Sequence, residues 1–458
     1  MIILVLLLVH LLFLINTQFT LWPEMVVYPY LLNNGFLLYR DIINPYPPLL
    51  IWFLTIFSRI FGYFPSPYQI LTWAVILIID LSIYTITGKL FKKRFYQLTS
   101  TLFFIILSIP FGVNGLWFDL VQTPLILWSL YFFYKFLNVK RGDDLKYNLF
   151  ISSLFLAVAF FIKQQVFWII LLFLSIALWK YKFNVSKFLR NHYLAALPIS
   201  TLLIIQSIYF TEQGILRDFI FWVLYFPAVA SKMPGYVLIP STRQLLVVFA
   251  LFGLFMPVIF KKSQPLFQTT TAILVLFAYP RFDYFHLIPA LAIASVMLGM
   301  IIDGFVKSNI LIKTIFLTSV VFLSLFTFRH IQEYWHSETR FFEREILKNA
   351  RVLDLVIRED RIVYLQNAPD QLLPISKTLP IKPWADDFPW YLEVANLQGR
   401  VIDGLVAEKP RFIIFQPYSE GRKYDLGSYR PTSVVNYINN NYEGFARIDS
   451  DLYFKIRK

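Results

Sequence analysis

Long apolar runs recur along the first 330 residues of this chain, and they constrain its fold more than any other feature. Each run has about 16 to 22 residues, enough for a helix that crosses, or nearly crosses, about 30 Å of hydrocarbon. We therefore predict an α-helical polytopic membrane protein with eleven spans and its two termini on opposite sides. The spans are expected at residues 2–21, 69–88, 96–112, 117–137, 147–163, 164–180, 193–211, 242–260, 266–281, 285–303 and 309–328.

The composition agrees with a membrane location. The chain has 57% apolar and 15% charged residues, whereas soluble domains average about 45–50% and about 25%. The first run has no basic segment before it and no small-residue cleavage site after it. We therefore interpret residues 2–21 as a retained span and not as a removed signal peptide.

The net charge of +14 is concentrated in the apolar part, where residues 1–335 hold 24 Lys and Arg against 11 Asp and Glu. Sixteen of these basic residues fall in alternate loops, which the positive-inside rule assigns to the cytoplasm. This sidedness explains the charge without a nucleic-acid partner. The sixteen are Lys89, Lys92, Lys93, Arg94, Lys135, Lys140, Arg141, Lys146, Lys180, Lys182, Lys187, Arg190, Lys261, Lys262, Lys307 and Lys313.

Most acidic residues of the apolar part fall on the opposite, extracytoplasmic side, so the chemistry is expected to face outward. The absence of cysteine excludes disulfides, thiolate nucleophiles and cysteine metal ligands. No phosphate-cradling Gly-rich motif, HExxH or GxSxG is found, so ATP-driven transport by this chain alone is not expected. The outward acids are Glu24, Asp41, Asp119, Glu212, Asp218, Asp283 and Glu333.

The first outer loop, residues 22–68, is too long for a simple connection. Its segment "YRDIINPYPPLLIW", residues 39–52, joins Arg40 and Asp41 to three prolines that stiffen the chain and interrupt a helix. Its aromatic residues suit the headgroup layer. We expect a rigid strap at the membrane surface that holds Asp41. The alternative is that Arg40 and Asp41 merely pair with each other.

Several outer segments share one pattern of acids, aromatics and prolines. They are Trp22 to Glu24, "GFLLYRD" with "NPYPPLLIW", "WFDLVQTPLILWSLYFF" (117–133), "FIKQQVFW" (161–168) and "YPRFDYFHLIPALA" (279–292). In order and sidedness these segments resemble GT-C fold glycosyltransferases that use polyprenyl-phosphate sugars, in the protein mannosyltransferase and aminoarabinose transferase group. The resemblance covers most of the chain and implies a GT-C-like bundle.

The resemblance implies a catalytic acid just after the first span, often in an Asp-Glu pair. Glu24 stands there alone, preceded by proline, while Asp41 is the second acid of that loop and Asp119 matches the acid of the second outer loop. Glu24 or Asp41 is thus the candidate general base. Asp41 and Asp119 are candidates to bind the acceptor or a divalent cation, Mg²⁺ or Mn²⁺. A helix N-terminal cap is the alternative for Asp119.

A polyprenyl-phosphate donor leaves a phosphate dianion, which fixed cations must stabilise. Arg281, His286 and Lys163 lie at predicted outer ends of spans and are the candidate phosphate ligands. The alternatives are an ion pair of Arg281 with Asp283, a snorkelling Lys163, and a His286 that only makes hydrogen bonds.

Two further regions of the apolar part have expected roles. Asp80 lies near the middle of the second span, and we expect it to bond to a neighbouring helix; His10 is interpreted as structural too. We expect Glu24, Asp41 and Asp119 to converge on one outer cavity. The outer loop from Glu212 to Arg243, which includes Pro234, is long enough to act as a lid over that cavity.

The tail, residues 336–458, has balanced charge and is predicted to be a small α/β domain outside the membrane. One helical face carries Ile346, Ala350, Leu353 and Ile357. Acceptor recognition and support of the bundle are both open roles, and a cluster of Trp384, Trp390 and Tyr391 either contacts sugar or packs. Strands are expected at 361–365, 411–415 and 452–456, and a helix at 432–442.

Together these features predict an inverting glycosyltransferase of the plasma (inner) membrane, with residues 1–335 as catalytic bundle and residues 336–458 extracytoplasmic. It would move a sugar from a polyprenyl-phosphate donor to a lipid, glycan or protein acceptor; the inverting outcome is implied by the resemblance. The alternative is a transporter or flippase of lipid-linked saccharides. That alternative predicts paired halves with broken helices, and no matching Gly/Pro-interrupted segments are found.

Overall fold

The computed structural model describes residues 2–91, 93–139, 143–233, 235–259, 265–357, 360–418, 429–449 and 451–458. These residues form two compact units. The helical unit comprises Met1–Thr20, Gln69–Gln206 and Leu238–Ser337, and the sheet unit comprises Leu21–Tyr68, Ser207–Val237 and Glu338–Lys458. The predicted division between residues 335 and 336 stays a prediction. Predictions at Lys92, Lys140, Arg141, Pro234, Lys261 and Lys262 lie outside the described residues.

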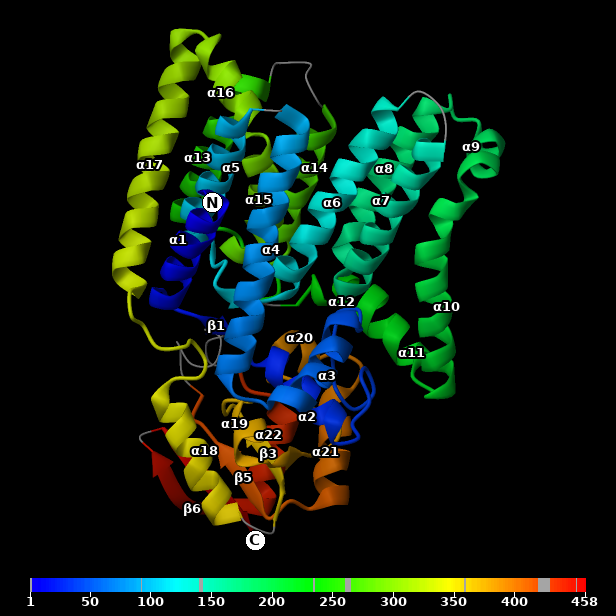
Figure 1. Cartoon of the computed structure of the whole chain (residues 1–458). Coiled ribbons are helices and arrows are strands. Elements are labelled where there is room, and N and C mark those ends of the chain that lie inside the picture. Colours follow the sequence, from blue (N-terminus) through cyan, green and yellow to red (C-terminus); the bar gives the residue numbers. More distant parts are fainter. Residues whose placement is uncertain are drawn as a thin grey trace. The chain divides into compact units, whose positions relative to one another are not determined.

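The helical unit is a bundle of apolar helices joined by short turns (Figure 1). Its elements, with α4 and α10 continuing into the sheet unit, are α1 (Ile2–Asn16), α4 (Pro65–Phe91), α5 (Arg94–Ser108), η1 (Ile109–Phe111), β2 (Gly115–Leu116), α6 (Phe118–Asn138), α7 (Asp143–Ile162), η2 (Gln164–Val166), α8 (Phe167–Lys180), α9 (Val185–His192), η3 (Tyr193–Ala196), α10 (Leu197–Glu212), α13 (Thr242–Ile259), α14 (Pro265–Val275), η5 (Leu276–Ala278), η6 (Tyr284–Leu287), α15 (Ile288–Val296), α16 (Leu298–Val306) and α17 (Ile310–Tyr334).

In the described part of the chain, six helices are long and apolar enough to cross a bilayer, which makes this a multi-pass membrane protein. A seventh candidate is the pair Tyr284–Val296 and Leu298–Val306, bent by 56°. The other four predicted spans correspond to shorter apolar helices, so the number eleven stays a prediction. The six are Pro65–Phe91, Arg94–Phe111, Phe118–Asn138, Asp144–Ile162, Tyr193–Glu212 and Ile310–Tyr334.

Polar contacts between helices hold this bundle together where apolar packing alone gives little specificity. Ser129 of α6 and Ser152 of α7 each donate a hydrogen bond to the other's backbone carbonyl at 2.9 Å. His10 Nδ1 of α1 lies 2.7 Å from Asp80 Oδ2 of α4, and both side chains are fully buried. This pair confirms the structural role expected for Asp80 and His10.

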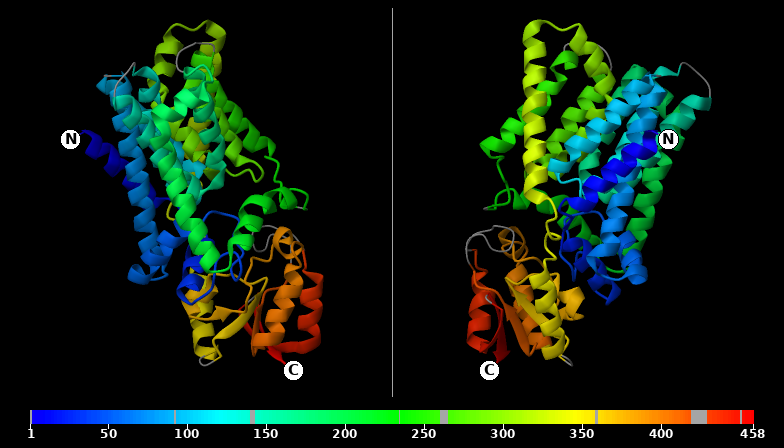
Figure 2. Two further views of the ribbon diagram at one scale, coloured as in Figure 1. Left: turned by 90° about the vertical axis from the view of Figure 1, so that its right-hand side faces the viewer. Right: turned by 60° about the vertical axis from the view of Figure 1, so that its left-hand side comes forward.

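The sheet unit combines helices from three parts of the chain with a C-terminal sheet (Figure 2). Its elements, with β1 shared between the units, are β1 (Thr20–Leu21), α2 (Glu24–Asn33), α3 (Leu49–Phe61), α11 (Leu216–Phe219), η4 (Ile220–Tyr225), α12 (Phe226–Ala230), α18 (Arg344–Ile357), β3 (Ile362–Gln366), α19 (Leu372–Ser376), β4 (Leu379–Pro380), α20 (Pro389–Leu392), α21 (Leu397–Glu408), β5 (Phe412–Phe415), α22 (Thr432–Asn441), β6 (Tyr442–Asp449) and β7 (Leu452–Arg457).

The sheet has five strands in the order β4-β3-β5-β7-β6. Strands β4, β3 and β5 run parallel, whereas β7 is antiparallel to both β5 and β6. The apolar runs at 361–365, 411–415 and 452–456 form β3, β5 and β7, which confirms those predictions. Ala350, Leu353 and Ile357 of α18 are buried, as their helical spacing predicts.

The strap, residues 39–52, pairs with the C-terminal part of the sheet unit through its backbone. The N–H of Trp384 donates to the carbonyl of Asp41 at 2.8 Å, and the N–H of Ile43 donates to the carbonyl of Trp384 at 3.0 Å. The strap then ends in α3, which begins at Leu49 directly after the prolines. Prolines and a strand-like backbone contact with the tail therefore both restrain the strap, and its rigidity at the membrane surface stays a prediction.

Candidate active site

The helical unit contains a compact buried cluster of one acid and two bases. Lys163 Nζ donates to Asp119 Oδ2 at 2.7 Å, and His286 Nδ1 donates to the same oxygen at 2.8 Å. Lys163 Nζ and His286 Nδ1 are 3.3 Å apart. The side chains of Asp119, Lys163 and His286 are only 1%, 4% and 10% exposed. Three candidate residues, predicted separately from the sequence, thus form one group, which we call the buried cluster.

Each member of the buried cluster lies at a helix boundary. Asp119 is in the first turn of α6, Lys163 is the extended residue between α7 and η2, and His286 lies in η6 before α15. Trp117 occupies the cap position of α6, so the cap alternative for Asp119 is wrong. The snorkelling alternative for Lys163 is also wrong, because its ammonium group is buried against a carboxylate.

Neighbouring side chains fix the orientation of the Asp119 carboxylate and of the His286 imidazole. Gln122 Nε2 donates to Asp119 Oδ1 at 3.1 Å, so both carboxylate oxygens have protein partners. The ring of Phe285 lies 4.2 Å from that of His286. Sequence reasoning missed Gln122, although its spacing of three residues from Asp119 places both on one helical face.

Arg281 belongs to the same chain segment as His286 but is not in the buried cluster. It is half-buried in an extended stretch that pairs with Leu238, whose N–H donates to the carbonyl of Pro280 at 2.9 Å. The carboxylate of Asp283 accepts the N–H of Tyr284 at 2.6 Å. Both interpretations of Arg281, phosphate ligand or partner of Asp283, therefore stay predictions.

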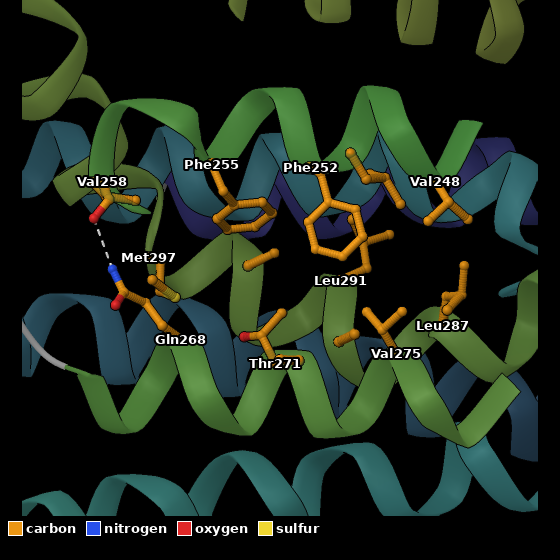
Figure 3. A pocket seen from close by; sticks show the side chains of 14 residues that line it. Val248, Phe252, Phe255, Val258, Gln268, Thr271, Val275, Leu287, Leu291 and Met297 are labelled. Atoms are coloured by element: carbon orange, nitrogen blue, oxygen red, sulfur yellow. Dashed lines mark hydrogen bonds between the residues drawn. The ribbon is translucent and has the colours of Figure 1, made fainter. Parts of the chain in front are cut away.

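An apolar cavity of about 210 Å³ lies between α13, α14 and α15 in the helical unit. Figure 3 shows Gln268 at one end, where its amide donates to the carbonyl of Val258 at 2.9 Å, and Leu287 at the other end with Val248. Leu287 directly follows His286 in η6. One residue that lines the cavity is thus the chain neighbour of His286, although none of the three residues of the buried cluster lines the cavity itself.

Glu24 lies in the sheet unit, half-buried in the first turn of α2. Burial raises the pKa of the Tyr28 hydroxyl well above its usual value, and Tyr391, Asp386 and Glu24 raise it further. Burial likewise raises the pKa of Tyr391, with Asp386 and Glu24 among its neighbouring acids. Both phenols therefore stay protonated at neutral pH, and the Tyr28 hydroxyl donates to the carbonyl of Ile43 at 3.4 Å. Sequence reasoning missed Asp386, which follows β4 in a stretch without a recognisable motif.

Asp41 lies in a different environment of the sheet unit. Its Oδ2 accepts the N–H of Leu37 at 3.0 Å and is 3.4 Å from Lys382 Nζ, while its Oδ1 is 3.4 Å from Arg40 Nε. The pairing with Arg40 raised as an alternative is therefore present, and Lys382 adds to it. Glu24 and Asp41 lie in one unit and Asp119 in the other, so a cavity common to all three stays a prediction.

The predicted metal ligands do not fit a divalent cation. Asp41 is engaged by two cations and a backbone N–H, and Asp119 by Lys163, His286 and Gln122. A hard cation needs several oxygen ligands that other charges do not occupy. In the part of the chain that the structure describes, no three His, Asp or Glu side chains form a metal-binding group. We therefore derive no step through a metal.

The aromatic cluster of the tail is packed inside the sheet unit. Trp384, Trp390 and Tyr391 are 5%, 3% and 8% exposed, and Trp390 stacks on Phe388 at 4.4 Å. Tyr391 stacks on Phe226 of α12 at 5.3 Å, so the loop between Glu212 and Arg243 contributes buried side chains. Trp384, Trp390 and Tyr391 therefore pack in the interior, as the second of the two interpretations predicts. The role of the loop between Glu212 and Arg243 as a lid stays a prediction.

Comparison of the whole chain with solved structures identifies its fold as the GT-C fold, as the resemblance predicts. The structure matches ArnT, an aminoarabinose transferase from Cupriavidus metallidurans, over 99% of this chain and 96% of that chain. The TM-score is 0.59 at 9% identity for the apo state and 0.54 at 10% identity for the complex with undecaprenyl phosphate.

An oligosaccharyltransferase from Archaeoglobus fulgidus, in a complex with Zn and sulfate, also matches. Its TM-score is 0.52 at 11% identity, over 98% of this chain and 72% of that chain. No protein-family model matches the sequence, and comparison with curated proteins gives no match. At these identities the likeness establishes the fold, and the chemistry must be argued from the site.

Proposed function

We propose that this protein is a glycosyltransferase that uses a polyprenyl-phosphate sugar as donor. The observation that carries the proposal is that one helical unit contains both an apolar cavity, which Leu287 helps to line, and the buried cluster of Asp119, Lys163 and His286. Such a donor needs an apolar trough for its isoprenoid chain and cationic groups for its phosphate. The likeness to ArnT, one structure of which holds undecaprenyl phosphate, agrees with this assignment.

In the proposed reaction an acceptor hydroxyl or amine attacks the anomeric carbon from the face opposite the phosphate, so the configuration inverts. The bond between that carbon and the phosphate oxygen breaks, and the phosphate leaves with the electron pair. Lys163 has two N–H donors beyond the one given to Asp119, whereas the Nε2 of a neutral His286 whose Nδ1 donates to Asp119 is an acceptor. The remaining donors of Lys163, with Arg281, would stabilise the departing dianion.

The acceptor's proton needs a base, and we assign that role to Glu24 in preference to Asp41. Glu24 raises the pKa of the buried Tyr28 and Tyr391 hydroxyls by like charge, so it lies near groups that stay neutral and do not pair with its charge. Asp41 already faces Arg40 and Lys382. We place the protein in the plasma membrane with the sheet unit outside the cytoplasm, as the basic loops predict.

The test is release of polyprenyl phosphate from a panel of polyprenyl-phosphate sugars by purified protein. Glu24→Gln should lower turnover by about 10²–10⁴-fold, whereas Asp41→Asn should lower it much less. Ala290→Phe, which fills the cavity, should raise KM for long-chain donors and leave water-soluble short-chain donors unaffected. Movement of labelled lipid across a bilayer without any phosphate release would instead identify a flippase.

A further inference from the structure

Four basic side chains gather around Asp41 and Asp218, and all six residues belong to the sheet unit. They come from separate stretches of the chain: Arg40 from the strap, Arg217 from α11, Lys382 from the segment after β4, and Arg400 from α21. We call these four residues the basic patch.

Specific contacts fix the basic patch. Arg400 Nη2 donates to the carbonyl of Arg40 at 2.7 Å, which ties α21 to the strap. Lys382 Nζ donates to the carbonyl of Gly35 at 3.4 Å and lies 4.5 Å from the centre of the Phe36 ring. Because these cations are held by backbone carbonyls and an aromatic face, little side-chain entropy remains to be lost on binding a ligand.

The positive charges of three guanidinium groups act on the carboxyl group of Asp218. Burial raises the pKa of the Asp218 carboxyl, while the positive charges of Arg400, Arg40 and Arg217 oppose that shift. Asp41 raises the same pKa by like charge. The three arginines of the basic patch therefore act on Asp218 together with Asp41, and Lys382 joins them through its ion pair with Asp41.

Asp41 and Asp218 are more buried than Arg40, Arg217 and Lys382. The side chain of Asp41 is 11% exposed, whereas those of Arg40 and Lys382 are 49% and 44% exposed. Asp218 is half-buried and Arg217 is exposed. The four cations outnumber Asp41 and Asp218 by two, and Arg40, Arg217 and Lys382 are exposed while Arg400 is half-buried.

We propose that the basic patch binds a phosphate-bearing anionic group of the sugar acceptor. Arginine forks match the spacing of phosphate oxygens, and exposed, fixed cations recognise such a group without burying charge. Its identification as the acceptor rests on the proposed glycosyltransferase function; its binding of anions does not. The phosphate belongs either to a lipid head group or to a soluble ligand.

Purified full-length protein in a neutral detergent, without a sugar donor, allows a test by equilibrium binding. The probes are dioctanoyl phosphatidic acid, inorganic phosphate and uncharged dioctanoylglycerol. Arg40→Gln/Arg217→Gln should weaken binding of the anionic probe at least about tenfold, and Lys382→Gln alone should weaken it several-fold. Lys409→Gln is the matched control, because this exposed lysine follows the end of α21, nine residues beyond Arg400.

Tight binding of phosphatidic acid, with weak binding of inorganic phosphate, assigns a lipid head group. Equal binding of both assigns a soluble phosphate ligand. Absence of anion binding, or binding that neither Arg40→Gln/Arg217→Gln nor Lys382→Gln weakens, overturns the proposal. Because no turnover is measured, these outcomes do not depend on whether the protein transfers sugar.

Discussion

Asp119 and Asp41 are the same side chain in opposite surroundings. Asp119 is 1% exposed and its partner Lys163 is 4% exposed, whereas the partners of Asp41 are 44% and 49% exposed. A buried charge needs its oppositely charged partner, because removing one of the two leaves the other buried, unpaired and without hydration. An ion pair at the surface contributes only about 0 to 1 kcal/mol. The buried cluster is therefore an arrangement that stability alone does not favour, which is a reason to assign it a function.

The largest effect is expected from Lys163→Gln, which leaves the carboxylate of Asp119 buried without its cation. We expect a loss of about 3–5 kcal/mol in the free energy of unfolding, seen as a lower Tm in detergent. The double variant Asp119→Asn/Lys163→Gln removes both charges and should recover most of that loss while staying inactive. A single variant as stable as the wild type would show that water reaches the buried cluster.

Arg281→Gln tests whether a half-buried cation outside the buried cluster serves the reaction. We expect turnover to fall about 10²–10³-fold with an almost unchanged Tm, because the lost interaction is made in the transition state. Arg281→Lys should keep part of the activity. If Arg281 instead serves an ion pair with Asp283, both Arg281→Gln and Asp283→Asn will lower Tm to a similar extent.

Asp41→Asn separates the anchoring role of this residue from catalysis. Asparagine keeps an oxygen for the N–H of Leu37 and loses only the charge, so stability should fall by about 1 kcal/mol. Asp41→Ala removes that acceptor as well and should cost about 1–3 kcal/mol. A loss of turnover as large as that of Glu24→Gln would return Asp41 to the position of candidate base.

The smallest effect is expected from Arg40→Gln, whose side chain is 49% exposed. Stability should change by no more than about 1 kcal/mol, and the change should shrink in about 1 M salt, where the Debye length is about 3 Å. The loss caused by Lys163→Gln should be nearly independent of salt. Equal salt sensitivity of the two variants would contradict the contrast between buried and surface charges.

Much of the fold was predictable because hydropathy is a local property. Each of the eleven predicted spans overlaps an apolar helix, including the bent pair around Met297. Strands β3, β5 and β7 were found from their apolar residues, whereas β6 was missed because most of "YEGFARID" is exposed and polar. The two-residue strand β4 is too short to give any signal.

The site was predictable as a set of residues but not as an arrangement. Asp119, Lys163 and His286 were each chosen for charge at an outer end of a span, yet their contacts join positions 44 and 167 residues apart. No local pattern encodes which cation meets which acid. The same reason explains why Asp386 and Lys382 escaped notice, since both act on residues of the first outer loop.

The backbone pairing of the strap with Trp384 also sets an order in time. Asp41 and Trp384 are separated by 343 residues, so at about 5–20 residues per second the strap leaves the ribosome roughly 20 to 70 s before its partner. Until then the N–H of Ile43 and the carbonyl of Asp41 lack the bonds that Trp384 later makes. A chain stopped before Trp384 would insert its helices and still present an unfinished outer loop, which marks it for proteolysis.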